Sequence, residues 1–385
     1  MKPWKKIVLA LETVLVLSLC VGCWNYHEVE NYTIIAGLAI DKGTGGHKYH
    51  LTFECISLMG GKDTPPQPVL IEADGDTIFD AVRGTISMTD KKLYFSDCKV
   101  VILSKEIAEN GIKPLMDFFI RDSEPRLTLN FLVSDEPTAG EVFRPKLASQ
   151  QPVSYQIAGM LQSQYALGRV LAIPLYQMYD ILGCSETCDE SLTLPNVRVV
   201  KTKGSEMVQT SNNVVFHQDK MVGTLPEEDG IYYLMLRNKL SGGLIVTGPD
   251  GGKDITLEIL KSSASIRPEV SGTNATMKIA IQVNAALAEE NTDSLQYNLA
   301  NEKFRKVEKM GAETIEQNVK KLVADDQKDY GADIFGFGKR IYEDNYSDWK
   351  ALSPRWEKVF PKVKCEVHAE VRLKNAARAY PKEGT

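Results

Sequence analysis

The chain has 385 residues, enough for two or three domains with buried cores at about 150 residues per domain. Hydrophobic residues make up 43% and charged residues 25%, which is typical of a globular protein and excludes both a disordered chain and a multi-span membrane protein. The net charge of −6 argues against nucleic-acid binding, because a phosphate-binding surface is usually built from an excess of lysine and arginine.

The first 23 residues have the pattern of a targeting segment. Three lysines within residues 1–6 precede a short apolar run over 7–19, which are the charged and hydrophobic regions of a secretory signal. The run is too short and too interrupted for a membrane span. It ends in C-V-G-C (20–23), where a small residue precedes a cysteine, as cleavage of a lipoprotein signal requires. We therefore expect Cys23 to begin the mature chain and to carry S-diacylglycerol and an N-acyl group.

This anchor would set the location of the protein. A lipid thioether tethers a soluble body to a bilayer without a helix that crosses it. Removal of residues 1–22 takes away three lysines and one glutamate, so the mature chain has 363 residues and a charge of −8. A body of that charge is not attracted to anionic lipid, and the anchor must supply the attachment. The alternative is an uncleaved amino-terminal anchor helix, which also places the chain outside the cytoplasm at a membrane surface.

The other cysteines do not form a disulfide framework, because five remain and their spacing is irregular. Cys55 and Cys365 fall in phase with apolar residues of strands and are interpreted as small buried side chains. Cys184 and Cys188 are the one closely spaced pair. They could form a local disulfide or half of a metal site, but no second Cys or His pair at zinc spacing accompanies them. A structural or incidental role is favoured.

Strands and helices interleave over the first 135 residues, as in a mixed α/β domain. The β-rich runs 32–41 and 48–58 flank a glycine loop and predict a hairpin. Asp76 is the predicted N-cap of a helix through Thr89, with apolar residues at helical spacing that comprise Phe79, Val82 and Ile86. The remaining predicted elements of this half are strands at 69–73, 99–103, 127–133 and 192–201, a helix at 112–120 and a helical region at 150–182.

The polar stretch 201–213 is the best candidate for a domain boundary. The elements predicted beyond it are a hairpin over 214–224, a helix over 226–236, strands at 240–247, 255–264, 277–287 and 363–373, and a long amphipathic helix over 301–328. We predict an α+β multidomain fold with mixed or antiparallel sheets and packed helices. Its expected parts are a signal peptide (1–22), a mixed α/β domain (23–150), a middle helical segment or small domain (151–205) and a carboxy-terminal α+β domain (206–385).

Catalytic motifs are absent from the sequence. It contains no Walker loop, G-x-S-x-G elbow, H-E-x-x-H pair or EF-hand loop. G-F-G (336–338) follows a helix rather than a strand, so it does not predict a dinucleotide site. The histidines are scattered, at His27, His47, His50, His217 and His368. We predict no catalytic residue, no metal ligand and no cofactor.

Two segments together resemble the Ger(x)C family, the C subunits of spore germinant receptors in endospore-forming bacteria. The first is C-W (23–24) leading through Glu28 into I-I-A-G-L-A-I-D (34–41). The second, A-D-I-F-G-F-G (332–338) followed by W-K (349–350), Trp356 and V-F-P-K-V (359–363), is the most specific part. The similarity runs over the whole mature chain. Asn25 departs from the acidic residue usual after Cys-Trp, and Cys20 departs from the family's leucine.

The resemblance implies a non-enzymatic lipoprotein on the outer face of the inner spore membrane, with a soluble part of three mixed α/β domains. It further implies assembly with a multi-span A subunit and a transporter-like B subunit in a complex that senses small nutrients. The alternative is a solute-binding lipoprotein of a membrane transporter, which should contain two doubly wound domains. The hairpins of the carboxy-terminal half disfavour it, and an anchored hydrolase ranks third. Gly336 and Gly338 are expected to form a tight turn over Phe335 and Phe337.

Overall fold

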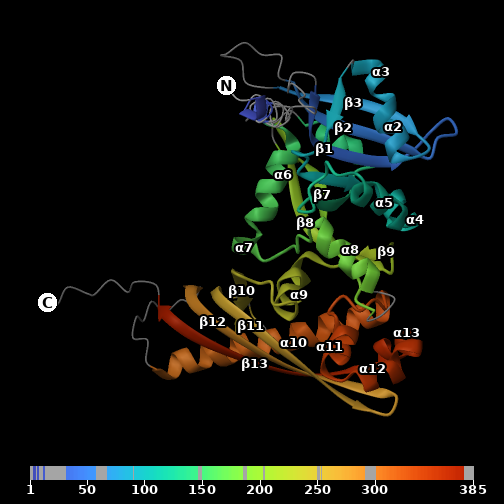
Figure 1. The fold of residues 1–385 in the computed structure, drawn as a ribbon. Helices are drawn as coiled ribbons and strands as arrows, with labels where there is room; N and C mark the ends of the chain where they lie inside the picture. The colour runs from blue at the N-terminus through green and yellow to red at the C-terminus, as the bar shows by residue number, and fades with distance from the viewer. Residues whose placement is uncertain are drawn as a thin grey trace.

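The computed structural model contains two β-sheets with packed helices, which confirms the α+β class. Figure 1 shows the first sheet in the upper part of the molecule and the second in the lower part. Cys23 and the predicted cleavage site lie outside the described residues. Those residues are 3–5, 7, 12–13, 32–57, 67–89, 91–145, 150–184, 189–202, 204–248, 252, 254–290 and 301–376.

The first sheet has nine strands in the order β3-β2-β1-β5-β6-β7-β8-β9, with β4 paired to the start of β1. The central strands β1, β5, β6 and β7 run parallel, and antiparallel hairpins extend the sheet on both sides. The bounds are β1 (Tyr32–Lys42), β2 (Tyr49–Ser57), β3 (Gln67–Gly75), β4 (Lys92–Tyr94), β5 (Val100–Leu103), β6 (Asn130–Ser134), β7 (Thr193–Thr202), β8 (Ser205–His217) and β9 (Lys220–Thr224).

Helical segments cover both faces of this sheet, which explains why β5 is buried along its whole length. Val101 and Leu103 face the larger core, while Val100 and Ile102 face a second cluster formed with α6 and η2. The bounds are α2 (Ile78–Gly84), α3 (Ile86–Thr89), α4 (Lys105–Asn110), α5 (Lys113–Arg121), η2 (Ala139–Phe143), α6 (Val153–Gln162), α7 (Gln164–Leu167) and α8 (Leu175–Cys184).

Two buried carboxylates attach helical segments to the first sheet. The Glu54 carboxylate, on β2, accepts hydrogen bonds from the backbone N–H groups of Val153 (2.7 Å) and Ser154 (2.8 Å) at the start of α6. The Asp41 carboxylate, on β1, accepts the N–H groups at the start of η2 at 2.7 and 3.1 Å. The first N–H groups of a helix lack partners within it, so these acids satisfy them inside the core.

The second sheet has four strands in the order β10-β11-β12-β13. All neighbours are antiparallel except β12 and β13, which run parallel. In β12 the alternation from Met277 to Ala285 is buried, as predicted. The bounds are β10 (Gly243–Thr247), β11 (Ile255–Ser271), β12 (Asn274–Glu290) and β13 (Lys364–Ala376), with η3 (Glu227–Asp229), α9 (Gly230–Leu236), α10 (Asn301–Asp329), α11 (Phe337–Asp344), α12 (Tyr346–Leu352), η5 (Ser353–Arg355), α13 (Trp356–Val359) and η6 (Phe360–Lys362).

The long helix α10 lies along the edge strand β13 as well as against the sheet. Its buried positions include Val307, Ile315 and Val319, which confirms the predicted apolar stripe. Two glutamates of α10 reach the outer edge of β13: Glu316 Oε1 accepts the N–H of Ala369 at 2.9 Å, and Glu308 Oε1 accepts the N–H of Leu373 at 2.8 Å. These backbone donors of the edge strand are therefore paired with side chains.

Two local predictions were wrong. The N-cap of α2 is Thr77 rather than Asp76, because the Thr77 hydroxyl accepts the N–H of Asp80. The helical region at 150–182 is broken after α7, where Gly168 has a φ of 64°. The polar stretch 201–213, proposed as a domain boundary, lies mostly in β7 and β8, which pair up to their turn at Thr202 and Ser205. The predicted division into domains stays a prediction.

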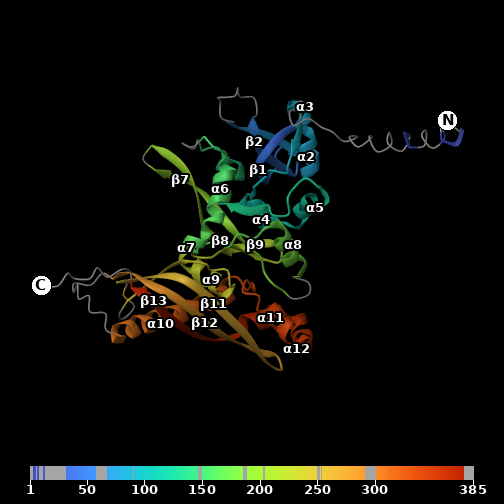
Figure 2. The same cartoon turned by 60° about the vertical axis from the view of Figure 1, so that its left-hand side comes forward.

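The two sheets share one continuous hydrophobic core. A single cluster of buried residues extends from Ile35 on β1 to Val371 on β13. Figure 2 shows β8 descending from the first sheet toward α9, which lies above the second sheet. The segment that joins the sheets therefore runs through buried contacts.

Candidate functional site: the junction between the two sheets

The segment 332–338, the most specific part of the family resemblance, lies where the two sheets meet. Gly336 has a φ of 74° and precedes α11, so the chain turns here through a conformation that glycine adopts without strain. The buried Asp333 carboxylate accepts the N–H groups of Phe337 (2.9 Å) and Gly338 (2.6 Å) at the start of α11. The tight turn between α10 and α11 is present as predicted, and Asp333 holds it.

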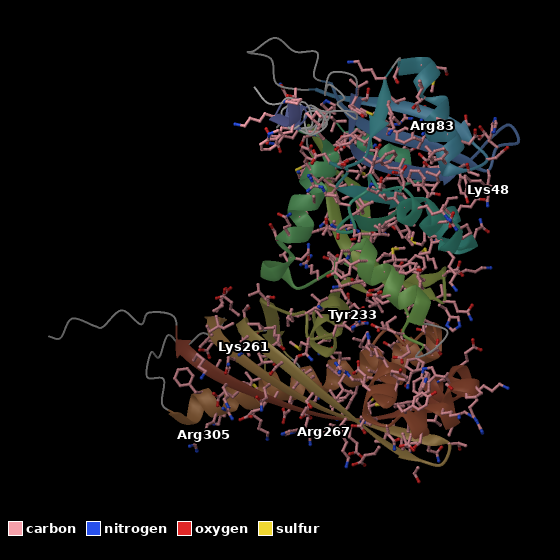
Figure 3. The ribbon with its side chains drawn as sticks, in the orientation of Figure 1. Lys48, Arg83, Tyr233, Lys261, Arg267 and Arg305 are labelled. Atoms are coloured by element: carbon pink, nitrogen blue, oxygen red, sulfur yellow. The ribbon has the colours of Figure 1, made fainter. Side chains whose placement is uncertain are left out.

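Aromatic side chains fill the space beneath this turn. Phe335 and Phe337 are buried, with ring centroids 5.2 Å apart. Phe335 contacts Tyr233 of α9 at 6.5 Å, and Phe337 contacts Phe360 at 6.3 Å. Figure 3 shows Tyr233 between the upper and lower parts of the molecule. Its hydroxyl is 2.8 Å from the Thr193 hydroxyl at the start of β7, so the aromatic cluster extends into the first sheet.

A buried ion cluster lies beside the turn. Glu190 is 3% exposed and forms an ion pair with Arg237, the residue that follows α9. Its carboxylate also lies 3.0 Å from the ammonium group of Lys339 on α11. Burial acts to raise the pKa of Glu190, but the two cations outweigh it and hold the pKa below its ordinary value. Arg237 also donates to the carbonyl of Ile334 at 2.5 Å. One carboxylate thus links three elements that are far apart in sequence.

Two other carboxyl groups here carry perturbed pKa values. Burial raises the pKa of Asp333 to about 7, although its two backbone hydrogen bonds act in the opposite direction. Asp326 of α10 is fully buried, and neither of its carboxyl oxygens has a hydrogen-bond partner in the described part of the chain. Burial, with the nearby charge of Asp333, raises the pKa of Asp326 well above its ordinary value. The neutral form of Asp326 is therefore favoured.

Further hydrogen bonds join the first sheet to the segment between α10 and α11. The N–H of Ser191, next to β7, donates to the carbonyl of Asp333 at 2.9 Å. The hydroxyl of Tyr330 donates to the carbonyl of Thr224 on β9 at 2.8 Å, and its ring leaves no room for a side chain at Gly223. The arrangement is suited to holding the two sheets in a fixed relation, because the polar groups named here, apart from the Asp326 carboxyl group, are bonded to one another.

The other sequence-predicted residues do not gather at this junction. Cys55 is buried and Cys365 half-buried, and both are free thiols in strands, as expected. Cys184 ends α8, and Cys188 lies outside the described residues, so the structure does not test whether the two pair. Among the residues that the structure describes, no group of three His, Cys, Asp or Glu side chains could hold a metal ion. His217 is 3.5 Å from Glu357.

Comparison with known proteins identifies the family on both sides of this junction. A model described as the spore germination protein N-terminal domain matches residues 25–199, and one described as spore germination B3/GerAC like, C-terminal, matches residues 211–376. The chain belongs to the Ger(x)C family of spore germination proteins. The break between the two matches falls at the β7–β8 turn, although both strands lie in the first sheet.

Ger(x)C relatives match along nearly their whole length. Spore germination protein B3 of Bacillus subtilis is 24% identical over 355 residues, which cover 90% of this chain and 91% of that protein. Spore germination protein KC of the same organism is 22% identical, with 96% of each chain covered. The crystal structure of the GerBC protein matches with a TM-score of 0.55 and 18% identity over 88% of this chain, which shows a shared fold.

Sequence reasoning missed the ion cluster of this Ger(x)C chain. Glu190, Arg237 and Lys339 come from three distant segments, and no local pattern connects them. Asp326 did leave a signal, because it continues the apolar positions Val319, Leu322 and Val323 on one face of α10. An acidic residue at such a position predicts either a buried partner or a neutral carboxyl group.

Proposed function

We propose that this protein is a lipid-anchored, non-enzymatic subunit of a nutrient germinant receptor complex, needed for spore germination in response to small nutrients. The observation that carries this proposal is the match of both halves of the chain to spore germination models. The proposed partners are the membrane-embedded A and B subunits, and no nucleic acid is involved. The proposed location is the outer face of the inner spore membrane.

The proposed attachment is through acylated Cys23. Tyr32, where β1 begins, comes nine positions after Cys23, so the anchor lies at most about 30 Å from the first sheet. β1 is a central strand of that sheet, with β2 on one side and β4 and β5 on the other. Among the described residues, no helix is both long enough and apolar enough to cross a bilayer.

The junction supports a role in which the chain transmits a conformational change between partner subunits or holds them in a fixed position. Its ion cluster, its aromatic cluster and its backbone hydrogen bonds connect the anchored first sheet to the second sheet. A displacement of one sheet would therefore be passed to the other through packed side chains rather than absorbed by a flexible linker. The runner-up, a solute-binding lipoprotein, fits less well, because β10, β11 and β12 form antiparallel hairpins rather than a doubly wound sheet.

The anchor is tested by replacing Cys23. Spores that produce the Cys23→Ala chain are expected to lack acylated protein in the inner membrane, measured by palmitate labelling and membrane fractionation. Cys20→Ala is the matched control, because it removes a nearby cysteine and leaves the proposed acylation site. A Cys23→Ala chain that is still labelled and membrane-bound would refute the anchor.

The partners are tested separately. The wild-type chain, solubilised from spore membranes in mild detergent, is expected to copurify with two other membrane proteins of the A and B types, identified by mass spectrometry. Recovery of the acylated chain without either protein would contradict the proposed complex and leave the anchor assignment intact.

A further inference from the structure

A second feature lies apart from the junction, in the first sheet's helical layer. A groove of about 700 Å³ opens between α2 and α3 on one side and α5 on the other. Pockets that bind small molecules usually have volumes of about 300–1,000 Å³. The floor consists of buried apolar residues, namely Ile78, Leu93, Phe95 and Phe118.

The wall of the groove is the apolar stripe of α2 and α3. Phe79 is 47% exposed and Ile86 is 38% exposed, whereas Ile78 and Ala81 of the same segment are buried. The segment therefore packs on the core through one set of positions and presents a second apolar set to the groove. A helical segment gains nothing from such residues unless something covers them.

Aromatic rings connect this wall to the core. The Phe79 and Phe118 ring centroids are 6.4 Å apart, and Phe118 lies 5.5 Å from Phe95 and 5.1 Å from Phe119. Phe119 in turn contacts Phe131 of the central strand β6 at 5.1 Å. The groove is thus lined by rings that the sheet holds in place, and a flat apolar group can stack there with little reorganisation.

Some of the cationic side chains at the rim of the groove form ion pairs, and others do not. Lys92 pairs with Glu124, and Arg121 lies 2.6 Å from Asp117. Two further cations at the rim contact only aromatic rings within the described chain: Lys48 Nζ is 5.1 Å from the Tyr49 ring centroid, and the Arg83 guanidinium is 4.9 Å from that of Phe79. Figure 3 shows Lys48 and Arg83 on the same side of the upper part of the molecule.

The acids without a cationic partner at the rim are engaged locally. Asp76 lies 3.5 Å from the His47 ring, and the Asp122 carboxylate accepts the N–H of Glu124 at 2.9 Å. The charged groups that remain available to a ligand are therefore Lys48 and Arg83, which lie next to exposed aromatic rings. Cations that already lie over a ring have lost part of their hydration and can bind an anion with less further cost.

We propose that this groove binds a small amphipathic anion, with an apolar, preferably aromatic group against Phe79 and Phe118 and a carboxylate at Lys48 and Arg83. The site does not depend on the receptor function proposed above. The shared chemistry of an apolar body and an anionic group also occurs in anionic lipids. The groove fits a free small molecule better than a lipid. Its cations lie next to its aromatic rings, so one compact ligand can contact both.

The test is calorimetric titration of the full mature chain, made without lipid by Cys23→Ser, with 3-phenylpropanoate. We expect saturable binding at one site. The uncharged 3-phenylpropanol should bind roughly tenfold to a hundredfold more weakly, because it lacks the charge-assisted contact. Arg83→Gln should weaken 3-phenylpropanoate binding by a similar factor, and Phe79→Ser should weaken both ligands.

Lys261→Gln is the matched control, since Lys261 on β11 of the second sheet is an exposed cation that forms no ion pair with another described residue (Figure 3). It should leave binding unchanged. Phe79 and Arg83 are exposed, so their variants should keep the wild-type circular dichroism spectrum. The proposal is overturned if 3-phenylpropanoate shows no saturable binding, if the alcohol binds equally well, if Lys261→Gln weakens binding as much as Arg83→Gln, or if phosphatidylglycerol vesicles displace the probe.

Discussion

Replacement of Asp333 by asparagine should destabilise the protein at acidic pH and stabilise it above neutral pH. Burial raises the pKa of the Asp333 carboxyl from 3.8 to about 7. Between these two values the native state keeps a proton that the unfolded chain has released, so the free energy of unfolding falls as the pH rises. At 1.36 kcal/mol per pKa unit, the loss approaches about 4 kcal/mol by neutral pH. Above pH 7 both states are ionised and the contribution is constant.

The asparagine side chain is neutral at every pH and escapes this loss. The two backbone N–H groups bind different oxygens of Asp333, and in asparagine an NH2 group replaces one of these acceptors. One hydrogen bond is therefore lost, which costs about 1 kcal/mol. We therefore expect Asp333→Asn to be about 1 kcal/mol less stable than the wild type near pH 4. Above pH 7 it should be up to about 3 kcal/mol more stable.

The assay is urea denaturation followed by tryptophan fluorescence at pH 4.5, 6 and 8. Trp349 and Trp356 are buried, and Trp356 contacts Phe360, which touches Phe337, so the signal reports on this part of the molecule. Burial raises the pKa of Asp326 in both proteins, whereas the Asp333 charge raises it only in the wild type, so Asp326 adds to the expected advantage of the variant at high pH. The reasoning is refuted if the difference in unfolding free energy is the same at all three pH values.

Three further substitutions test other contacts of the junction. Arg237→Met should lower the free energy of unfolding by about 3–5 kcal/mol, because Glu190 loses its closest cation. Adding Glu190→Gln to the same chain should restore part of the lost stability. A double variant as unstable as Arg237→Met alone would contradict this explanation. Gly223→Ala should cost about 1–3 kcal/mol, because its Cβ would lie 2.2 Å from the Tyr330 ring, and Tyr330→Ser should relieve the clash in a thermal melt. Gly336→Ala should cost about 1–2 kcal/mol, measured by urea denaturation, because φ is 74° while the added Cβ would make only an ordinary contact with Glu190 at 3.7 Å. Gly336→Asn should cost less, and equal losses would argue against backbone strain.

The elements that could be predicted from the sequence are those whose burial follows a simple period. β12 and the middle of β13 alternate apolar and polar residues, and α10 repeats apolar positions every three or four residues. Only the end of β8, at 214–217, was predicted as a strand. Residues 205–213 were missed because most of them are polar, although Thr210, Ser211 and Asn213 are buried, and pairing with β7 supplies the order that composition does not. The outer half of β11 was missed for the same reason.

The junction could be predicted only in part. The G-F-G turn follows from Gly336 and its neighbouring aromatic residues, because glycine and apolar residues have local meaning. The ion cluster depends on long-range placement: Glu190 and Lys339 are separated by 149 residues, and nothing near either residue indicates the other. The groove was hidden for the opposite reason, since the stripe that contains Phe79 and Ile86 has the spacing of an ordinary packed helix.

The glutamates that cover the outer edge of β13 restrict how this protein can assemble. Eight residues of helix rise about 12 Å and four residues of strand about 13 Å, so Glu308 and Glu316 match the spacing of Leu373 and Ala369 on the antiparallel path. An edge with two of its donors already bonded to side chains is a poorer template for a strand from another copy. Around Ala369 and Leu373, contacts between copies or with partner subunits are therefore expected through side-chain surfaces rather than by extension of the second sheet.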